Sequence, residues 1–166
     1  VNGTPSKPIA LRAATPGKVI LRGESRFHIG AQWWVIEGFR FDGREGEFNS
    51  YNAMEFRGRG GVGAQHVRLR NCAMTDLVAE GSSSKWILMF GRFNTIDHCH
   101  FSGKRSKGAL ITVELGYLGA NETAGHRFVS NYFADFTPQG GTDNETIRIG
   151  YSGDQNKPAS CLVEQN

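Results

Sequence analysis

The chain has 166 residues, with 19 Lys and Arg side chains, 16 Asp and Glu side chains and a formal net charge of +3. This near balance of charge excludes a strongly basic nucleic-acid-binding protein but leaves room for a local basic groove that binds an anionic polymer. Hydrophobic residues make up 39% of the chain, which excludes a disordered protein, and no apolar run approaches the roughly 20 residues of a membrane helix.

Short segments rich in Val, Ile, Phe and Trp occur along the whole chain, and we expect them to be strands. In chain order they are Ile9–Ala14, Lys18–Arg22, Trp33–Ile36, Trp86–Phe90, Leu110–Glu114 and Thr146–Ile149. Turn-forming segments rich in Gly, Pro, Asn and Asp lie between them, and the chain has 22 glycines. This pattern predicts an all-β protein with many short strands.

One short pattern recurs along the chain: an apolar residue, two residues of any kind, a small or polar residue, one more residue, and a large apolar residue. The clearest copies are Ile96–Phe101 and Phe128–Phe133, and looser copies begin at Ile36, Leu69 and Val163. The first positions are 33, 27, 32 and 35 residues apart. A fixed short core with variable spacing is typical of a solenoid whose rungs carry loops of different lengths.

The sequence therefore predicts a right-handed parallel β-helix, with residues 1–166 as a single domain. The first and last positions of the repeat should point inward and stack as apolar ladders. Cys99 and Asn131 should lie where the chain bends, and an inward Asn131 can bond backbone groups of the neighbouring rung. The three cysteines, Cys72, Cys99 and Cys161, are expected to be buried thiols, because their odd number argues against a complete disulfide framework.

Three stretches, in the same order along the chain, resemble family 6 of the polysaccharide lyases, which includes alginate lyases and chondroitinase B. They are Asn2–Val19, Asn94–Phe101 and Glu145–Tyr151. The resemblance implies a parallel β-helix and an enzyme that cleaves an acidic, uronate-containing polysaccharide by β-elimination. Alginate is the expected substrate, because the Glu145–Gly150 stretch is closer to that branch. Chondroitin or dermatan sulfate, and a non-catalytic β-helix that binds glycans, remain alternatives.

The resemblance also implies a Lys base and an Arg acid, on rungs that follow the Ile147–Tyr151 stretch in the family. The catalytic residues are therefore unknown here, and we expect the chain to be an internal portion of a larger lyase domain, incomplete at both ends. Arg148 matches a substrate-binding position, since a guanidinium can pair bidentately with a uronate carboxylate. A structural ion pair is the alternative role for Arg148.

Two further site residues are implied by the resemblance. Phe90 stands where some relatives carry a Tyr, and it is a candidate substrate contact or an aromatic of the groove wall. Where the family uses calcium, an Asn six residues before the Arg holds it together with two Glu. That position is Thr142 here, and the nearest asparagine, Asn144, is the candidate Ca²⁺ ligand unless the protein does not use this site.

Basic residues cluster at Arg57, Arg59, Arg68 and Arg70 and again at 104–107, where loops of adjacent rungs can line one groove or can be solvated. His98 and His100 are expected to share an outward face. The expected partner is an anionic polysaccharide, with no nucleic acid and no membrane, and the oligomeric state stays open. Such polymers are degraded outside the cytoplasm, so a periplasmic or secreted location is expected.

Overall fold

The computed structural model describes residues 1–43, 52–77, 84–137 and 144–166. Within these ranges the regular elements are short β-strands and a single 3-10 turn, η1 (Ser152–Asp154). The strands form three sheets, and every pair of neighbouring strands runs parallel. None of the helical structure in these ranges is long and apolar enough to cross a bilayer. The predicted all-β parallel fold is confirmed.

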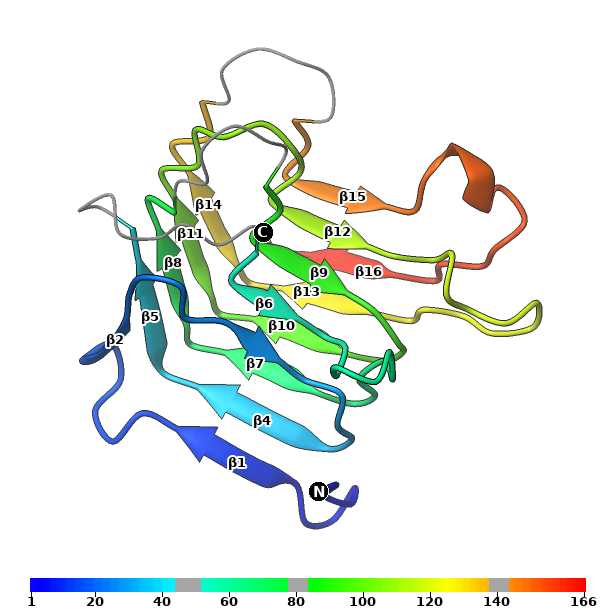
Figure 1. The fold of residues 1–166 in the computed structure, drawn as a ribbon, viewed down its shortest axis with the longest axis horizontal. Helices are drawn as coiled ribbons and strands as arrows, with labels where there is room; N and C mark the ends of the chain where they lie inside the picture. The colour runs from blue at the N-terminus through cyan, green and yellow to red at the C-terminus, as the bar shows by residue number, and fades with distance from the viewer. Residues whose placement is uncertain (44–51, 78–83, 138–143) are drawn as a thin grey trace.

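The chain passes through the three sheets in turn, so that each full rung adds one strand to each sheet (Figure 1). The first sheet contains β1 (Ile9–Arg12), β4 (Trp34–Glu37), β7 (Arg68–Arg70), β10 (Thr95–Asp97), β13 (Arg127–Val129) and β16 (Leu162–Glu164). The second contains β2 (Val19–Leu21), β5 (Phe39–Asp42), β8 (Ala73–Thr75), β11 (His100–Ser102) and β14 (Tyr132–Ala134). The third contains β3 (Phe27–His28), β6 (Met54–Glu55), β9 (Ile87–Met89), β12 (Ile111–Val113) and β15 (Ile147–Ile149).

The copies of the sequence repeat lie in register in the first sheet. Ile36 pairs with Leu69, Leu69 with Ile96, Ile96 with Phe128, and Phe128 with Val163. All but the last of these side chains are buried. Because strand residues of the same position stack from rung to rung, the repeat produces one continuous apolar ladder. The prediction that its first position points inward is confirmed.

The last position of the repeat forms a second ladder, in the second sheet. Phe41 pairs with Met74, Met74 with Phe101, and Phe101 with Phe133. The rings of Phe101 and Phe133 are stacked with centroids 5.1 Å apart. The two ladders meet in one core, which explains why the chain keeps large apolar residues at these positions while its loops vary.

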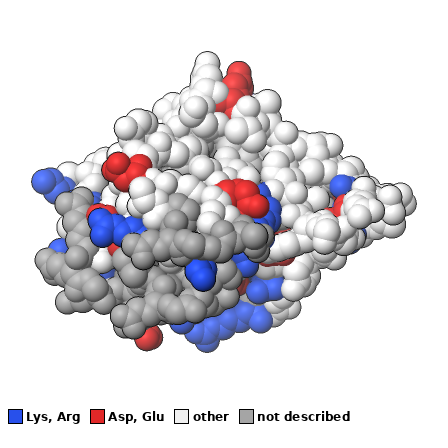
Figure 2. All heavy atoms as spheres, turned by 90° about the horizontal axis from the view of Figure 1, so that it is seen from above, with Lys and Arg blue, Asp and Glu red and all other residues white. Residues whose placement is uncertain are grey.

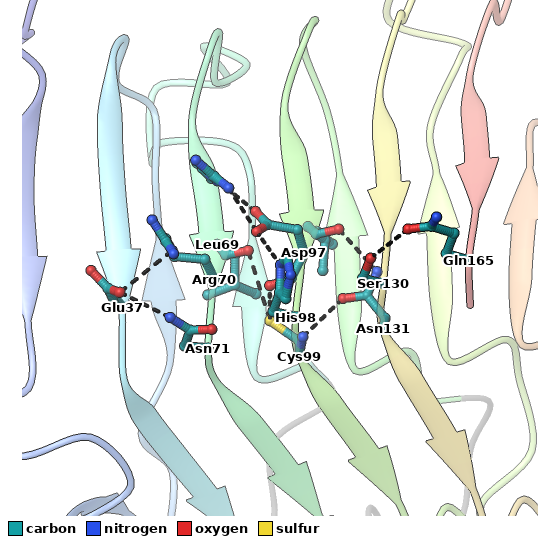
Figure 3. Close-up of polar contacts among 12 residues, drawn as sticks. Glu37, Leu69, Arg70, Asn71, Asp97, His98, Cys99, Ser130, Asn131 and Gln165 are labelled. Carbon is teal, nitrogen blue, oxygen red and sulfur yellow. Dashed lines mark hydrogen bonds and ion pairs between the residues drawn. The ribbon is translucent and has the colours of Figure 1, made fainter.

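Asn131 lies at the corner between the first and second sheets, where it satisfies backbone groups of the neighbouring rung (Figure 3). Its Oδ1 accepts from the backbone N of Cys99 at 3.1 Å, and its Nδ2 donates to the carbonyl of Ile96 at 2.9 Å. Asn166 repeats the arrangement one rung later, since its Nδ2 donates to the carbonyl of Phe128 at 2.9 Å. The expected inward asparagine is confirmed. It closes the corner with backbone hydrogen bonds that an apolar side chain cannot make.

The thiols of Cys72 and Cys99 occupy the same corner position in the two preceding rungs. Both side chains are buried, and all three cysteines of the chain are free. Cys161 is only half-buried, because it lies in the last rung of the structure. Burial raises the pKa of the Cys99 thiol well above its ordinary value. The corner thiols therefore pack as small apolar groups.

The corners of the rungs hold residues in the left-handed backbone region. Among the described residues other than glycine, those with positive φ are Trp33, His66, Asn71, Asp76, Phe93, His98, Ser130, Asp135, Ser160 and Gln165. His98 is thus a corner residue and not part of a strand, whereas His100 begins β11 in the next sheet. Both histidines are exposed, as expected, but they do not share one strand face, because the chain bends between them.

Candidate functional site

The outer face of the third sheet carries a ladder of chemically different side chains. Arg148 in β15 pairs with Thr112, which pairs with Leu88, then Glu55 and finally His28. Except for Ile149 in the last of these strands, which is exposed, the residues that alternate with them belong to the apolar core or pack against it. Since successive side chains of a strand point to opposite faces, this ladder faces away from the core, although Thr112 within it is buried. It places a cation at one end of the face and a carboxylate near the other.

Arg148, the predicted substrate-binding residue, lies in an ion pair at this face. Its Nη2 donates to both carboxylate oxygens of Glu145, at 3.1 and 2.9 Å. The Arg148 side chain is only 12% exposed, whereas that of Glu145 is 47% exposed. The pair therefore reaches the surface through Glu145, and a substrate carboxylate would compete with Glu145 for the guanidinium. A substrate-binding role of Arg148 stays a prediction.

Tyr151 connects this ion pair to the preceding rung. The Arg148 guanidinium lies 5.3 Å from the centroid of the Tyr151 ring. The Tyr151 hydroxyl donates to Glu114 at 3.1 Å, and its backbone N donates to Asp154 at 2.9 Å. Tyr151 is thereby held between two acidic side chains, beside the cation. The arrangement presents a donor-rich and acceptor-rich edge of the kind that recognises sugar hydroxyls and carboxylates.

Asn144, the candidate calcium ligand, is next to Glu145 in the chain. Thr142, the position that the family pattern singles out, lies outside the described residues. In the described ranges no group of three or more His, Cys, Asp or Glu side chains could hold a metal ion. The carboxylate beside Asn144 is already paired with a guanidinium, which disfavours a cation there. The described residues alone therefore do not fit a calcium site, and calcium stays a prediction.

Phe90, the second predicted substrate contact, is buried at the end of β9 with 4% of its surface exposed. The Arg57 guanidinium lies 3.9 Å from its ring centroid. Tyr117 meets the ring edge-on at a centroid distance of 5.0 Å. These contacts make Phe90 part of a wall beside the third sheet, which is the second of the two roles considered for it. Direct contact with substrate stays a prediction.

The basic residues of the sequence are not brought together into one groove. Arg57 follows β6 at the third sheet, whereas Arg68 and Arg70 lie on the outer face of the first sheet. Arg68 donates to both oxygens of Asp97 at 2.6 and 2.8 Å. Burial alone would raise the pKa of Asp97, but hydrogen bonds from Arg68 and His98 outweigh it and hold the pKa below its ordinary value. The first sheet is therefore faced by neutralised charge pairs.

Lys104 departs most from its expected role as a solvated or groove-lining charge. Its side chain is fully buried, and its Nζ donates to the carbonyls of Ser106 at 2.7 Å and Lys107 at 3.2 Å. Burial lowers the pKa of Lys104 to about 8. The ammonium therefore holds its own loop together and does not face a polyanion. Seen from above, both the Lys and Arg and the Asp and Glu side chains are scattered over the face, and some of the basic ones lie together along its lower edge (Figure 2).

Comparison with known proteins places this chain and its fold in one family. The family model described as Chondroitinase B matches residues 1–166. The structure of the PL6 family alginate lyase AlyGC is 30% identical, has a TM-score of 0.87 and covers 100% of this chain and 23% of its own. The chain belongs to this family of polysaccharide lyases. Comparison with curated proteins gives no match.

Two further solved structures are similar. A mannuronic acid specific polysaccharide family 6 lyase from human gut microbiota is 27% identical with a TM-score of 0.84, covering 99% of this chain and 38% of its own. A PL6 alginate lyase in complex with a trisaccharide is 18% identical with a TM-score of 0.77, covering 93% and 35%, and supports the fold alone. The present chain thus spans 23% to 38% of the length of these lyases.

The side chains that surround Phe90 were not predicted from the sequence. Tyr117, Arg92 and Glu122 come from loops without a recognisable motif, and the structure brings them to one place. The uneven spacing of the repeat contained the relevant information, because its shortest gap, 27 residues, separates Leu69 from Ile96. A short rung between two longer rungs leaves a hollow at the edge of the third sheet.

Proposed function

We propose that this chain forms part of a lyase that cleaves alginate by β-elimination, with the outer face of the third sheet as its substrate-binding surface. The family membership supports a polysaccharide lyase, and similar solved structures are alginate lyases. The observation that carries the proposal is the position of Arg148. It lies in the middle of β15 on the outer face, beside the exposed carboxylate of Glu145.

The proposed role of Arg148 is to neutralise a uronate carboxylate. The proton on C5 of a uronate is weakly acidic, and a cation on the adjacent carboxylate stabilises the negative charge that develops when the proton leaves. A base then takes the C5 proton, the bond from C4 to the linking oxygen breaks, and an acid protonates the departing oxygen. The product is an unsaturated uronate. No base or acid is assigned within this chain.

Tyr151 and Glu114 are proposed to orient the sugar. Their contact at 3.1 Å lies beside Arg148. The Tyr151 hydroxyl can donate to or accept from sugar hydroxyls, and the Glu114 carboxylate can accept from them. Calcium is left out of the scheme, because the described residues do not make a site for it. A location outside the cytoplasm, periplasmic or secreted, follows from the proposed substrate and is part of the proposal.

The test is the ultraviolet absorbance of the unsaturated uronate product. The 166-residue chain and a longer polypeptide that contains it are incubated with alginate and with dermatan sulfate, with calcium or with a chelator. Product from alginate supports the proposal, and a loss of product with the chelator would assign calcium. Product only from the longer polypeptide would place the base and acid outside these 166 residues.

Two outcomes favour the alternatives. Product from dermatan sulfate but not from alginate would replace the substrate and keep the reaction, in line with the Chondroitinase B description of the family model. Binding of either polymer without any product from either polypeptide would indicate a glycan-binding β-helix that does not catalyse cleavage.

A further inference from the structure

The lengths of three successive connections create a notch at the edge of the third sheet. Residues 90–94 join β9 to β10, whereas residues 56–67 join β6 to β7 and residues 114–126 join β12 to β13. All three connections leave the same end of the third sheet (Figure 1). The short middle connection therefore lies between two longer neighbours, and it forms the floor of a pocket of about 200 Å³.

Glycines allow the floor of this notch to be deep. Gly91 has a φ of 74°, and a Cβ at this position would lie 2.0 Å from the carbonyl oxygen of Ala64. A Cβ on Gly63 would in turn lie 2.6 Å from the Cα of Gly91. Any larger residue would push the 57–63 turn away from the short connection. The backbones are in close contact here, so the space above them stays open to a ligand.

The walls of the notch combine aromatic rings with a partly exposed ion pair. Phe90 and Tyr117 provide the apolar wall. Arg92 and Glu122 lie in the lining and pair at 3.0 Å through Nη1 of the arginine, with side chains 29% and 43% exposed. Glu122 is fixed by the backbone N of Gly119, which donates to its Oε2 at 2.9 Å. The guanidinium thus has a fixed partner and still reaches solvent.

This combination matches one sugar residue that carries a carboxylate. An arginine can bind a carboxylate through two parallel N–H groups, and a neighbouring carboxylate and amide, here Glu122 and Gln65, can bind sugar hydroxyls. A space of about 200 Å³ holds the equivalent of roughly six or seven waters at liquid density, which is the scale of a single sugar ring and not of a longer chain.

The notch also lies in line with the proposed substrate-binding surface. Backbone bonds from Glu114 to Met89 and from Gly150 to Val113 continue the register past the strands, so that Phe90, Glu114 and Gly150 stack. Parallel strands are about 4.8 Å apart, which places the notch floor, two strands from β15, roughly 10 Å along the axis from the Arg148 rung. A short oligosaccharide can span this distance.

We propose that the notch is a second uronate-binding subsite, in which Arg92 binds the carboxylate of a sugar residue in the same polymer that Arg148 engages. This inference rests on the proposed function. It makes Arg92 a specificity-determining residue for chain length, because only an oligosaccharide that extends from the Arg148 rung to the short connection can fill both positions.

The experiment is calorimetric titration of the 166-residue chain with alginate di-, tetra- and hexasaccharides. The variant Arg92→Met should bind the hexasaccharide about tenfold more weakly, which corresponds to ~1.4 kcal/mol, the low end for hydrogen bonds to a charged group because Arg92 is partly exposed. Its affinity for the disaccharide should equal that of the wild type. Arg148→Met should weaken the binding of all three. Arg127→Met, an exposed arginine of the first sheet, is the matched control and should change none.

Three results would overturn the proposal, and they are distinguishable. If Arg92→Met binds every length like the wild type while Arg148→Met loses affinity, the subsite is wrong and the proposed function stands. If Arg92→Met weakens the binding of the disaccharide as much as that of the hexasaccharide, Arg92 does not distinguish oligosaccharides by their length. If the wild type binds no uronate oligosaccharide of any length, both the subsite and the proposed function fail.

Discussion

Asn131 and Cys99 join two rungs through one buried hydrogen bond, in which the backbone N of Cys99 donates to Oδ1 of Asn131 at 3.1 Å. The same amide donates to the carbonyl of Ile96 at 2.9 Å, and only 4% of Asn131 is exposed. The Cys99 amide lies at the corner between β10 and β11, outside any strand, and the Ile96 carbonyl belongs to β10 in the same rung. A side chain thus substitutes for a sheet partner.

Replacing Asn131 by Ala should lower the free energy of unfolding by about 2–4 kcal/mol, because two buried backbone groups lose their partner. Urea unfolding followed by circular dichroism measures the change. The control is Ser130→Ala at the preceding, half-buried position, whose hydroxyl bonds only a side chain, Gln165, among the described residues, so we expect a change below about 1 kcal/mol. Equal effects of the two substitutions would show that the corner does not depend on the amide.

Stability should fall on acidification between pH 6.5 and 4 because of His126. This side chain is fully buried, its Nδ1 accepts from the backbone N of Asn94 at 3.1 Å, and burial lowers its pKa from 6.5 to about 4. In this pH range the unfolded chain binds a proton that the folded chain does not, so unfolding becomes easier as pH falls. The contribution is on the order of 3 kcal/mol.

The variant His126→Asn keeps an acceptor and does not titrate, so its stability should change less between pH 6.5 and 4 than that of the wild type. Urea unfolding at a series of pH values gives the comparison. His100→Gln, at an exposed position at the start of β11, should leave the wild-type pH dependence in place. A His126→Asn profile parallel to the wild type would show that the imidazole is not the group responsible.

Lys104 should change stability in the same direction as His126, but in alkaline solution. Burial lowers its pKa from 10.5 to about 8, so between these values the unfolded chain retains a proton that the folded chain has released. Stability should therefore rise with pH from about 8 to 10.5, by up to about 3 kcal/mol. Thermal unfolding of Lys104→Met should lack this rise. The exposed Lys107→Met should retain it, and a rise in both variants would exclude Lys104 as its source.

Glu145 should compete with substrate for Arg148. If the proposed function is right, Glu145→Gln removes the competing carboxylate and should tighten the binding of uronate oligosaccharides by about fivefold, the scale of a partly exposed ion pair of ~1 kcal/mol. Titration calorimetry measures the affinity, and Glu164→Gln on the first sheet is the control. Weaker binding after Glu145→Gln would mean that this carboxylate orients the guanidinium for substrate.

The fold could be predicted because the sequence repeat has an apolar residue at each position that stacks in a ladder. Ile36, Leu69, Ile96 and Phe128 pair in the order in which they occur, since stacking in a solenoid depends on local position within the rung. Loop contacts follow no such rule. Lys104 looked solvated or groove-lining in the sequence, and it is buried because its loop folds back onto its ammonium.

The candidate site was predicted less completely for the same reason. The alternation of side chains along a strand is consistent with Arg148 on the outer face, but only the structure shows that Arg148 pairs with Glu145. Arg92 and Glu122 are 30 residues apart in the chain. They come together because Arg92 lies on the short connection 90–94 and Glu122 lies on the longer connection of the next rung. The spacing of the repeat predicted loops of unequal length but not what side chains their edges would carry.

The corner between the first and second sheets has a constant length in four successive rungs. Gly38–Phe39, Asn71–Cys72, His98–Cys99 and Ser130–Asn131 each place two residues between register-matched positions, with a positive φ at the first. The first two sheets thus form a constant frame in these rungs. The length of a rung varies instead in the connection from the second sheet to the third and in the connection from the third sheet to the first. Segments such as 57–63 or 114–126 could accordingly be exchanged between related chains, changing which sugars fit while leaving the frame unaltered.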